Sequence, residues 1–87
     1  MLRENMAIKK AMRRAKVLGF YHVENGQALS DEALTNLARS ESFAFAYTSR
    51  FYNHVAPVIR PAYEKAFVVV YNDVVSHYSA MKNVQQQ

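Results

Sequence analysis

Residues 60–81, RPAYEKAFVVVYNDVVSHYSAM, form the segment that decides the fold class. The run Phe-Val-Val-Val-Tyr at 67–71 is rich in residues that favour strands, so a strand has to be weighed against a helix. Across the whole segment, the apolar residues recur with a period of about 3.6 and share one side of a helical wheel, with Lys65 and Asn72 opposite. The period therefore predicts a helix over residues 60–81 and an all-α fold.

Two prolines stand at the start of this segment. Pro57 and Pro61 both lack the N–H group that a helix uses, and each disfavours helical geometry at the residue before it. Pro61 can nevertheless be accommodated in the first turn of a helix. We therefore predict a kink or a short turn over residues 57–61, which separates the helix at 60–81 from the one before it.

Residues 41–56 predict a helix with two apolar faces. One stripe recurs at every fourth position from Phe43, while Phe45 and Tyr52 lie across from it. Only a narrow polar strip near Arg50 remains, so we expect this helix at the centre of the bundle or against a second subunit. Because aromatic residues and Arg dominate interface energetics, the candidate interface on its second face consists of Phe45, Arg50 and Tyr52.

Residues 31–39 carry the signals of a helix start. Ser30 is a good N-cap, and Asp31 and Glu32 suit the positive end of the helix dipole. The serines at 40 and 42 offer a second capping signal before the aromatic run. The helices at 31–39 and 41–56 are therefore either separate or continuous.

Residues 2–18 predict a basic amphipathic helix at the N-terminus. Its apolar side is made mainly of Ala and Met, and its cations share the opposite side. These candidate binding residues are Arg3, Lys9, Lys10, Arg13, Arg14 and Lys16. Gly19 is a natural end for this helix. Residues 19–29 contain the turn-forming pair Asn25 and Gly26, and we expect a loop or a small hairpin there.

Together these segments predict a small three- or four-helix bundle in a single domain, 1–87, with a frayed tail at 83–87. The formal net charge is +4, but residues 1–18 hold six cations and one acid, while the other 69 residues hold five cations and six acids. The positive charge therefore belongs to the N-terminal helix. Five Phe and six Tyr are many rings for so small a core, so a protein partner or a homo-oligomer is expected to cover some of them.

The composition also bears on the compartment. The chain has no cysteine, so it has no disulfide and no thiolate ligand, which favours a cytoplasmic location over secretion. No apolar run approaches the roughly 20 residues that a membrane span needs. No apolar segment with a cleavage site follows the basic N-terminus, so a secretory signal is not expected.

Motifs that carry chemistry are missing from the sequence. It contains no Gly-rich phosphate loop, no nucleophile elbow and no metalloprotease motif, so we predict no enzymatic activity and no cofactor. Asp73 and His77 are four residues apart and could share an ion with His54. Two ligands with an uncertain third match no common ligand set, so no metal site is predicted.

Two functions remain. The sequence favours a small non-catalytic binding protein that docks on a larger partner with an acidic surface, as an adaptor, inhibitor or regulator of the kind that phages and other mobile elements encode. The alternative is nucleic-acid binding, with the cations of the N-terminal helix on phosphates. That binding would weaken with salt at a slope of about −0.9 per phosphate on duplex DNA.

Overall fold

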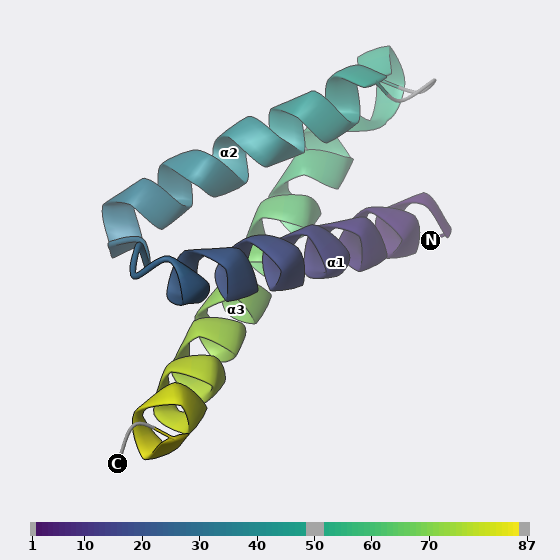
Figure 1. The fold of residues 1–87 in the computed structure, drawn as a ribbon. Coiled ribbons are helices and arrows are strands. Elements are labelled where there is room, and N and C mark those ends of the chain that lie inside the picture. The colour runs from purple at the N-terminus through teal and green to yellow at the C-terminus, as the bar shows by residue number, and fades with distance from the viewer. Residues whose placement is uncertain (1, 49–51, 86–87) are drawn as a thin grey trace.

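The computed structural model describes the backbone of residues 2–48 and 52–85, and the side chains of residues 4–47 and 57–82. These segments form three α-helices and no strand: α1 (Leu2–Glu24), α2 (Asp31–Thr48) and α3 (Tyr52–Gln85). α1 and α3 run in the same general direction and α2 returns against them (Figure 1). The all-α prediction is confirmed. α3 is the central helix, because both α1 and α2 pack on it.

The core is built from side chains spaced four residues apart on each helix. α3 contributes a row that begins at Ile59 and ends at Tyr71, α1 contributes alanines, and α2 contributes Leu34 and Ala38. The buried row on α3 consists of Ile59, Tyr63, Phe67 and Tyr71, and the alanines are Ala7, Ala11 and Ala15. Rows at this spacing interdigitate when two helices cross obliquely, as α1 and α3 do in Figure 1.

Gly19 does not end the first helix, contrary to the sequence prediction. It lies inside α1, where a Cβ atom would sit 3.2 Å from the Cγ1 of Val74. This glycine therefore lets α1 approach α3 closely. The helix ends instead at Glu24, and Gly26 follows with a φ of +65°, the left-handed conformation that suits glycine.

The loop or hairpin predicted over residues 19–29 is therefore wrong for residues 19–24, which continue α1. Asn25 and Gly26 belong to a helix-ending motif rather than a hairpin turn. The Gly26 N–H donates to the Val23 carbonyl at 3.1 Å, and the Gln27 N–H donates to the His22 carbonyl at 2.7 Å. These are the two hydrogen bonds of a Schellman motif.

Ser30 caps α2 as predicted. Its Oγ accepts a hydrogen bond from the Ala33 N–H at 3.2 Å. The second capping signal does not interrupt the helix, because Ser42 is fully buried and its Oγ lies 2.8 Å from Oε1 of Glu64 on α3. Residues 31–48 are thus one helix, and a separate central helix over 41–56 is not formed.

α3 begins at Tyr52, eight residues before the predicted start at 60. Pro57 and Pro61 lie inside this helix, so the predicted turn is not formed. Both prolines are exposed. In a regular α-helix the N–H of residue 61 would donate to the carbonyl of Pro57, but Pro61 has no N–H. Because the prolines are exposed, water can hydrate this carbonyl instead.

Candidate functional site

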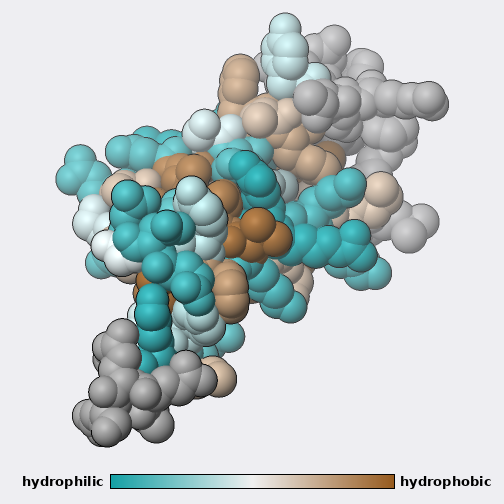
Figure 2. Space-filling model, in the orientation of Figure 1, coloured by the Kyte–Doolittle hydropathy of each residue, from teal (hydrophilic) through white to brown (hydrophobic). Residues whose placement is uncertain are grey.

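A groove of about 340 Å³ lies where all three helices meet. Its lining consists of Lys10, Arg13, Arg14 and Val17 from α1, Phe45 from α2 and Tyr63 from α3. We call this site the cationic groove. It joins two features that the sequence placed on separate helices, namely the basic face of α1 and the candidate interface residue Phe45. Figure 2 shows apolar side chains exposed among hydrophilic ones on this side of the molecule.

The floor of the cationic groove is a stacked pair of rings. The Phe45 and Tyr63 centroids are 5.2 Å apart, with 25° between the ring planes. Tyr63 is only 3% exposed and stacks in turn on Phe67, at 6.3 Å. Burial raises the pKa of Tyr63, and the charge of Glu41 raises it further. The floor is therefore neutral at ordinary pH and fixed by the core.

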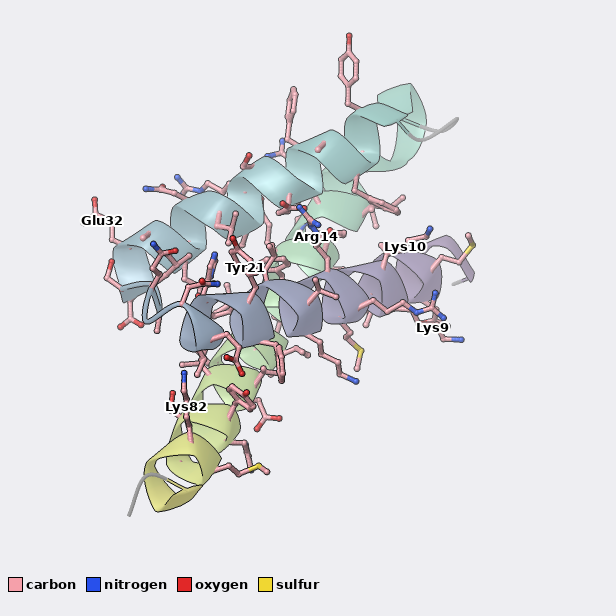
Figure 3. The ribbon with its side chains drawn as sticks, viewed as in Figure 1. Lys9, Lys10, Arg14, Tyr21, Glu32 and Lys82 are labelled. Carbon is pink, nitrogen blue, oxygen red and sulfur yellow. The ribbon has the colours of Figure 1, made fainter. Side chains whose placement is uncertain are left out.

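Arg14 forms the wall between α1 and α2. Its Nε and Nη2 atoms donate to the two carboxylate oxygens of Glu41, at 2.9 and 3.1 Å. This hydrogen bonding raises the pKa of Arg14. A two-point pair of this kind fixes the orientation of the guanidinium and neutralises most of its charge. Figure 3 shows Arg14 reaching from α1 toward α2.

Lys10 and Arg13 supply the free charge of the groove. Both are exposed, and neither forms an ion pair or hydrogen bond with a residue in the described parts of the chain. Lys9 and Lys16 are also exposed and unpaired there, but they do not line the groove. Lys9 extends from α1 away from α2 in Figure 3. The cations of α1 therefore divide into groove residues and free surface residues.

The sequence analysis did not include Phe20 and Tyr21 among the candidate binding residues, because it ended the basic helix at residue 18. They are 49% and 58% exposed, and Tyr21 follows Val17 by one turn on the side that faces α2 (Figure 3). Continuing the helical period past Gly19 would have found them. Tyr21 therefore extends the basic face at its C-terminal end, whereas the ring of Phe20 packs on Tyr78 of α3, with the centroids 4.3 Å apart.

The other predicted site residues fall outside the described side chains. Arg3 and Tyr52 lie in helices, but their side chains are not described, and Arg50 lies outside the described residues altogether. Of the candidate interface on residues 41–56, only Phe45 can be placed, and it lies in the cationic groove.

The positions of the histidines and acidic residues do not indicate a metal site among the described side chains. His77 Nδ1 lies 2.9 Å from the Asp73 carbonyl oxygen and 3.3 Å from its carboxylate, on an exposed surface. The side chain of His54 is outside the described set. Among the residues that the structure describes, no three His, Cys, Asp or Glu side chains are grouped to hold a metal ion.

Comparisons with protein-family models, with curated proteins and with solved structures found no match. Within the described residues, no helix is both long and apolar enough to cross a membrane. The chemistry of the cationic groove is therefore the basis for a functional proposal. Two unpaired cations beside a neutral aromatic floor can bind a carboxylate or phosphate together with an adjacent apolar group.

Proposed function

We propose that the protein is a small non-catalytic binding protein, an adaptor, inhibitor or regulator, that docks on an acidic segment of a larger protein. The observation that carries this proposal is the meeting of unpaired Lys10 and Arg13 with Val17 and Phe45 in one groove. An acidic side chain of the partner pairs with the two cations. A neighbouring apolar side chain covers Val17 and the edge of Phe45.

The lining favours a protein over a nucleic acid as the ligand. Half of it is apolar or aromatic, whereas nucleic-acid affinity comes mainly from cations on phosphates. Arg14 is already paired with Glu41, so two of the three lining cations are left for a ligand, which suits a single acidic side chain better than a run of phosphates. The absence of cysteine fits a partner in the reducing interior of a cell.

Nucleic-acid binding is the second candidate, and the exposed Lys9 and Lys16 favour it. They extend the positive surface beyond the cationic groove, on a part of α1 where the described residues offer them no ion pair. A phosphate backbone lying along α1 would use both sets of cations equally. A docked acidic segment of a protein would use the groove residues far more than Lys9 and Lys16.

Two variants with the same change in charge separate these functions. Lys10→Glu with Arg13→Glu alters the groove, and Lys9→Glu with Lys16→Glu alters the free surface of the same helix. We expect affinity capture from host lysate, after nuclease treatment, to recover a partner with the wild type and the surface variant but not with the groove variant. Equal recovery by all three proteins would contradict docking in this groove. A salt-sensitive gel shift that both variants weaken equally would support the nucleic-acid candidate instead.

A further inference from the structure

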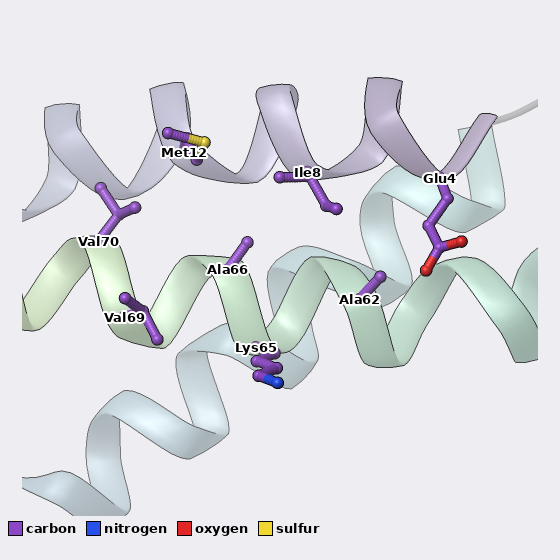
Figure 4. A pocket seen from close by; sticks show the side chains of 8 residues that line it. All are labelled: Glu4, Ile8, Met12, Ala62, Lys65, Ala66, Val69 and Val70. Carbon is purple, nitrogen blue, oxygen red and sulfur yellow. The ribbon is translucent and has the colours of Figure 1, made fainter. Parts of the chain in front are cut away.

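A second groove, of about 520 Å³, lies between α1 and α3 on the other flank of α1. Its walls consist of Ile8 and Met12 from α1 and of Ala62, Ala66, Val69 and Val70 from α3, with Glu4 and Lys65 as the charged members (Figure 4). We call it the apolar groove. It shares no residue with the cationic groove, so the two surfaces can be tested separately.

The lining of the apolar groove is suited to a helix rather than to a small molecule. Small-molecule sites place a few polar groups to orient the ligand, and here the polar side chains are two charges of opposite sign. Three of the α3 lining residues, Ala62, Lys65 and Val69, continue a 4-3-4 spacing that begins at Val58, one turn before the groove. This is the spacing of a seam between paired helices. Val58 and Val69 are 55% and 59% exposed, so this seam has no cover within the described residues.

We propose that a second copy of the chain covers the apolar groove, in a two-fold symmetric dimer. The accessible surface of the chain is 6221 Å², whereas a folded monomer of 10.0 kDa exposes about 5,200 Å². The excess of about 1,000 Å² belongs to the chain as a whole, and covering one face of roughly 800 Å², as in a standard interface, would bring the exposed area close to the usual value. The elongated shape, 51 × 23 × 16 Å, leaves α3 room to pair along this edge.

The charges also favour a second copy at this surface. The chain carries a formal charge of +4, so two copies repel each other wherever the cations of α1 meet. The apolar groove instead holds one acid and one base, Glu4 and Lys65, neither of which is in an ion pair with a described residue. In a two-fold interface, each contact occurs twice, so Glu4 of each copy can face Lys65 of the other.

Light scattering coupled to size-exclusion chromatography tests the dimer. The wild type is expected to approach twice 10.0 kDa as its concentration rises. Val69→Arg places an unpaired guanidinium in the seam and is expected to weaken the dimer by about tenfold or more. Val17→Arg is the matched control, because Val17 is 62% exposed but lies in the cationic groove, and it should leave the dimer intact.

A wild type that stays at 10.0 kDa at all concentrations would overturn the proposal, as would a dimer that Val17→Arg disrupts and Val69→Arg does not. Circular dichroism of both variants establishes that each retains its helices.

A charge swap tests the two-fold arrangement. Glu4→Lys and Lys65→Glu should each weaken the dimer, and the double variant should recover most of the loss. A double variant weaker than both single variants would contradict the reciprocal pairing.

Discussion

The two flanks of α1 are held in place by different kinds of interaction. On the flank that packs against α3, alanines and Gly19 let α1 lie close to that helix, so the contact depends on shape. On the flank of the cationic groove, the pairing of Arg14 with Glu41 and the stacking of Phe45 on Tyr63 join the three helices. Shape-dependent contact is insensitive to salt, whereas the ion pair of the cationic flank should respond to it. The following predictions test this difference, from the largest effect to the smallest.

The largest effect is expected on the shape-dependent flank. Gly19→Leu raises helix propensity but forces a side chain into a space where even a Cβ lies 3.2 Å from Val74. We expect a net loss of about 1–3 kcal/mol in the free energy of unfolding, measured by urea denaturation. Lys16→Leu adds the same side chain at an exposed position of α1 and should change stability by less than about 0.5 kcal/mol. A Gly19→Leu variant as stable as the wild type would show that α1 does not approach α3 closely.

The next effect concerns the position of α2 beside the groove. Ser42 is fully buried, and its Oγ lies 2.8 Å from Glu64 and 3.4 Å from the Nε of Arg60. Ser42→Ala removes the hydroxyl that links these groups and should cost about 1 kcal/mol in the free energy of unfolding, measured by heat or urea. Ser40→Ala is the control at an exposed position of the same helix and should have little effect. Equal losses in the two variants would contradict a stabilising network between α2 and α3.

High pH is expected to destabilise the fold through its buried tyrosines. Burial raises the pKa of Tyr63 and Tyr71, and a hydrogen bond to Glu24 raises that of Tyr78. The protonated form is therefore favoured in the folded state, and its stabilising contribution is complete below the ordinary tyrosine pKa of about 10. Stability should therefore fall as the pH rises above that value.

Tyr63→Phe tests the contribution of the groove floor to this loss. The variant should lose less stability than the wild type between pH 8 and pH 11, in urea titrations at each pH. The same loss in both proteins would show that Tyr63 ionises as readily in the folded chain as in the unfolded one.

The smallest effect is expected from the ion pair on the cationic flank. Glu41→Gln removes the charge that pairs with Arg14, whose side chain is 50% exposed, so the loss should be under about 1 kcal/mol. Added salt should reduce the difference in the free energy of unfolding between the variant and the wild type. Unfolding measured at low and high salt checks this result. A loss that is independent of salt would mean that Glu41 acts through packing.

Local patterns predicted much of the fold. The period of residues 60–81 identified a helix against strand propensity, and Ser30 identified the start of α2. The role of Gly19 was predicted wrongly, because the sequence alone does not distinguish a glycine that ends a helix from one that permits close packing between helices. The prolines were misread because the exposure of the carbonyl that Pro61 leaves unpaired depends on the tertiary structure.

The candidate site was predictable in its parts but not in its assembly. The cations of α1 follow from the helical period, and Phe45 follows from the second apolar face of its helix. Their meeting depends on Arg14 and Glu41, which are 27 residues apart in sequence. No local rule links residues at that separation. The division of the cations into groove and surface sets therefore required the structure.

The central claim is that Lys10 and Arg13 act within a groove and not as part of a uniformly charged face. The most direct test is the Kd of the captured partner for the two charge-matched variants at one salt concentration. We predict that Lys10→Glu with Arg13→Glu weakens binding by about tenfold or more relative to Lys9→Glu with Lys16→Glu. Equal affinities of the two variants would contradict the claim.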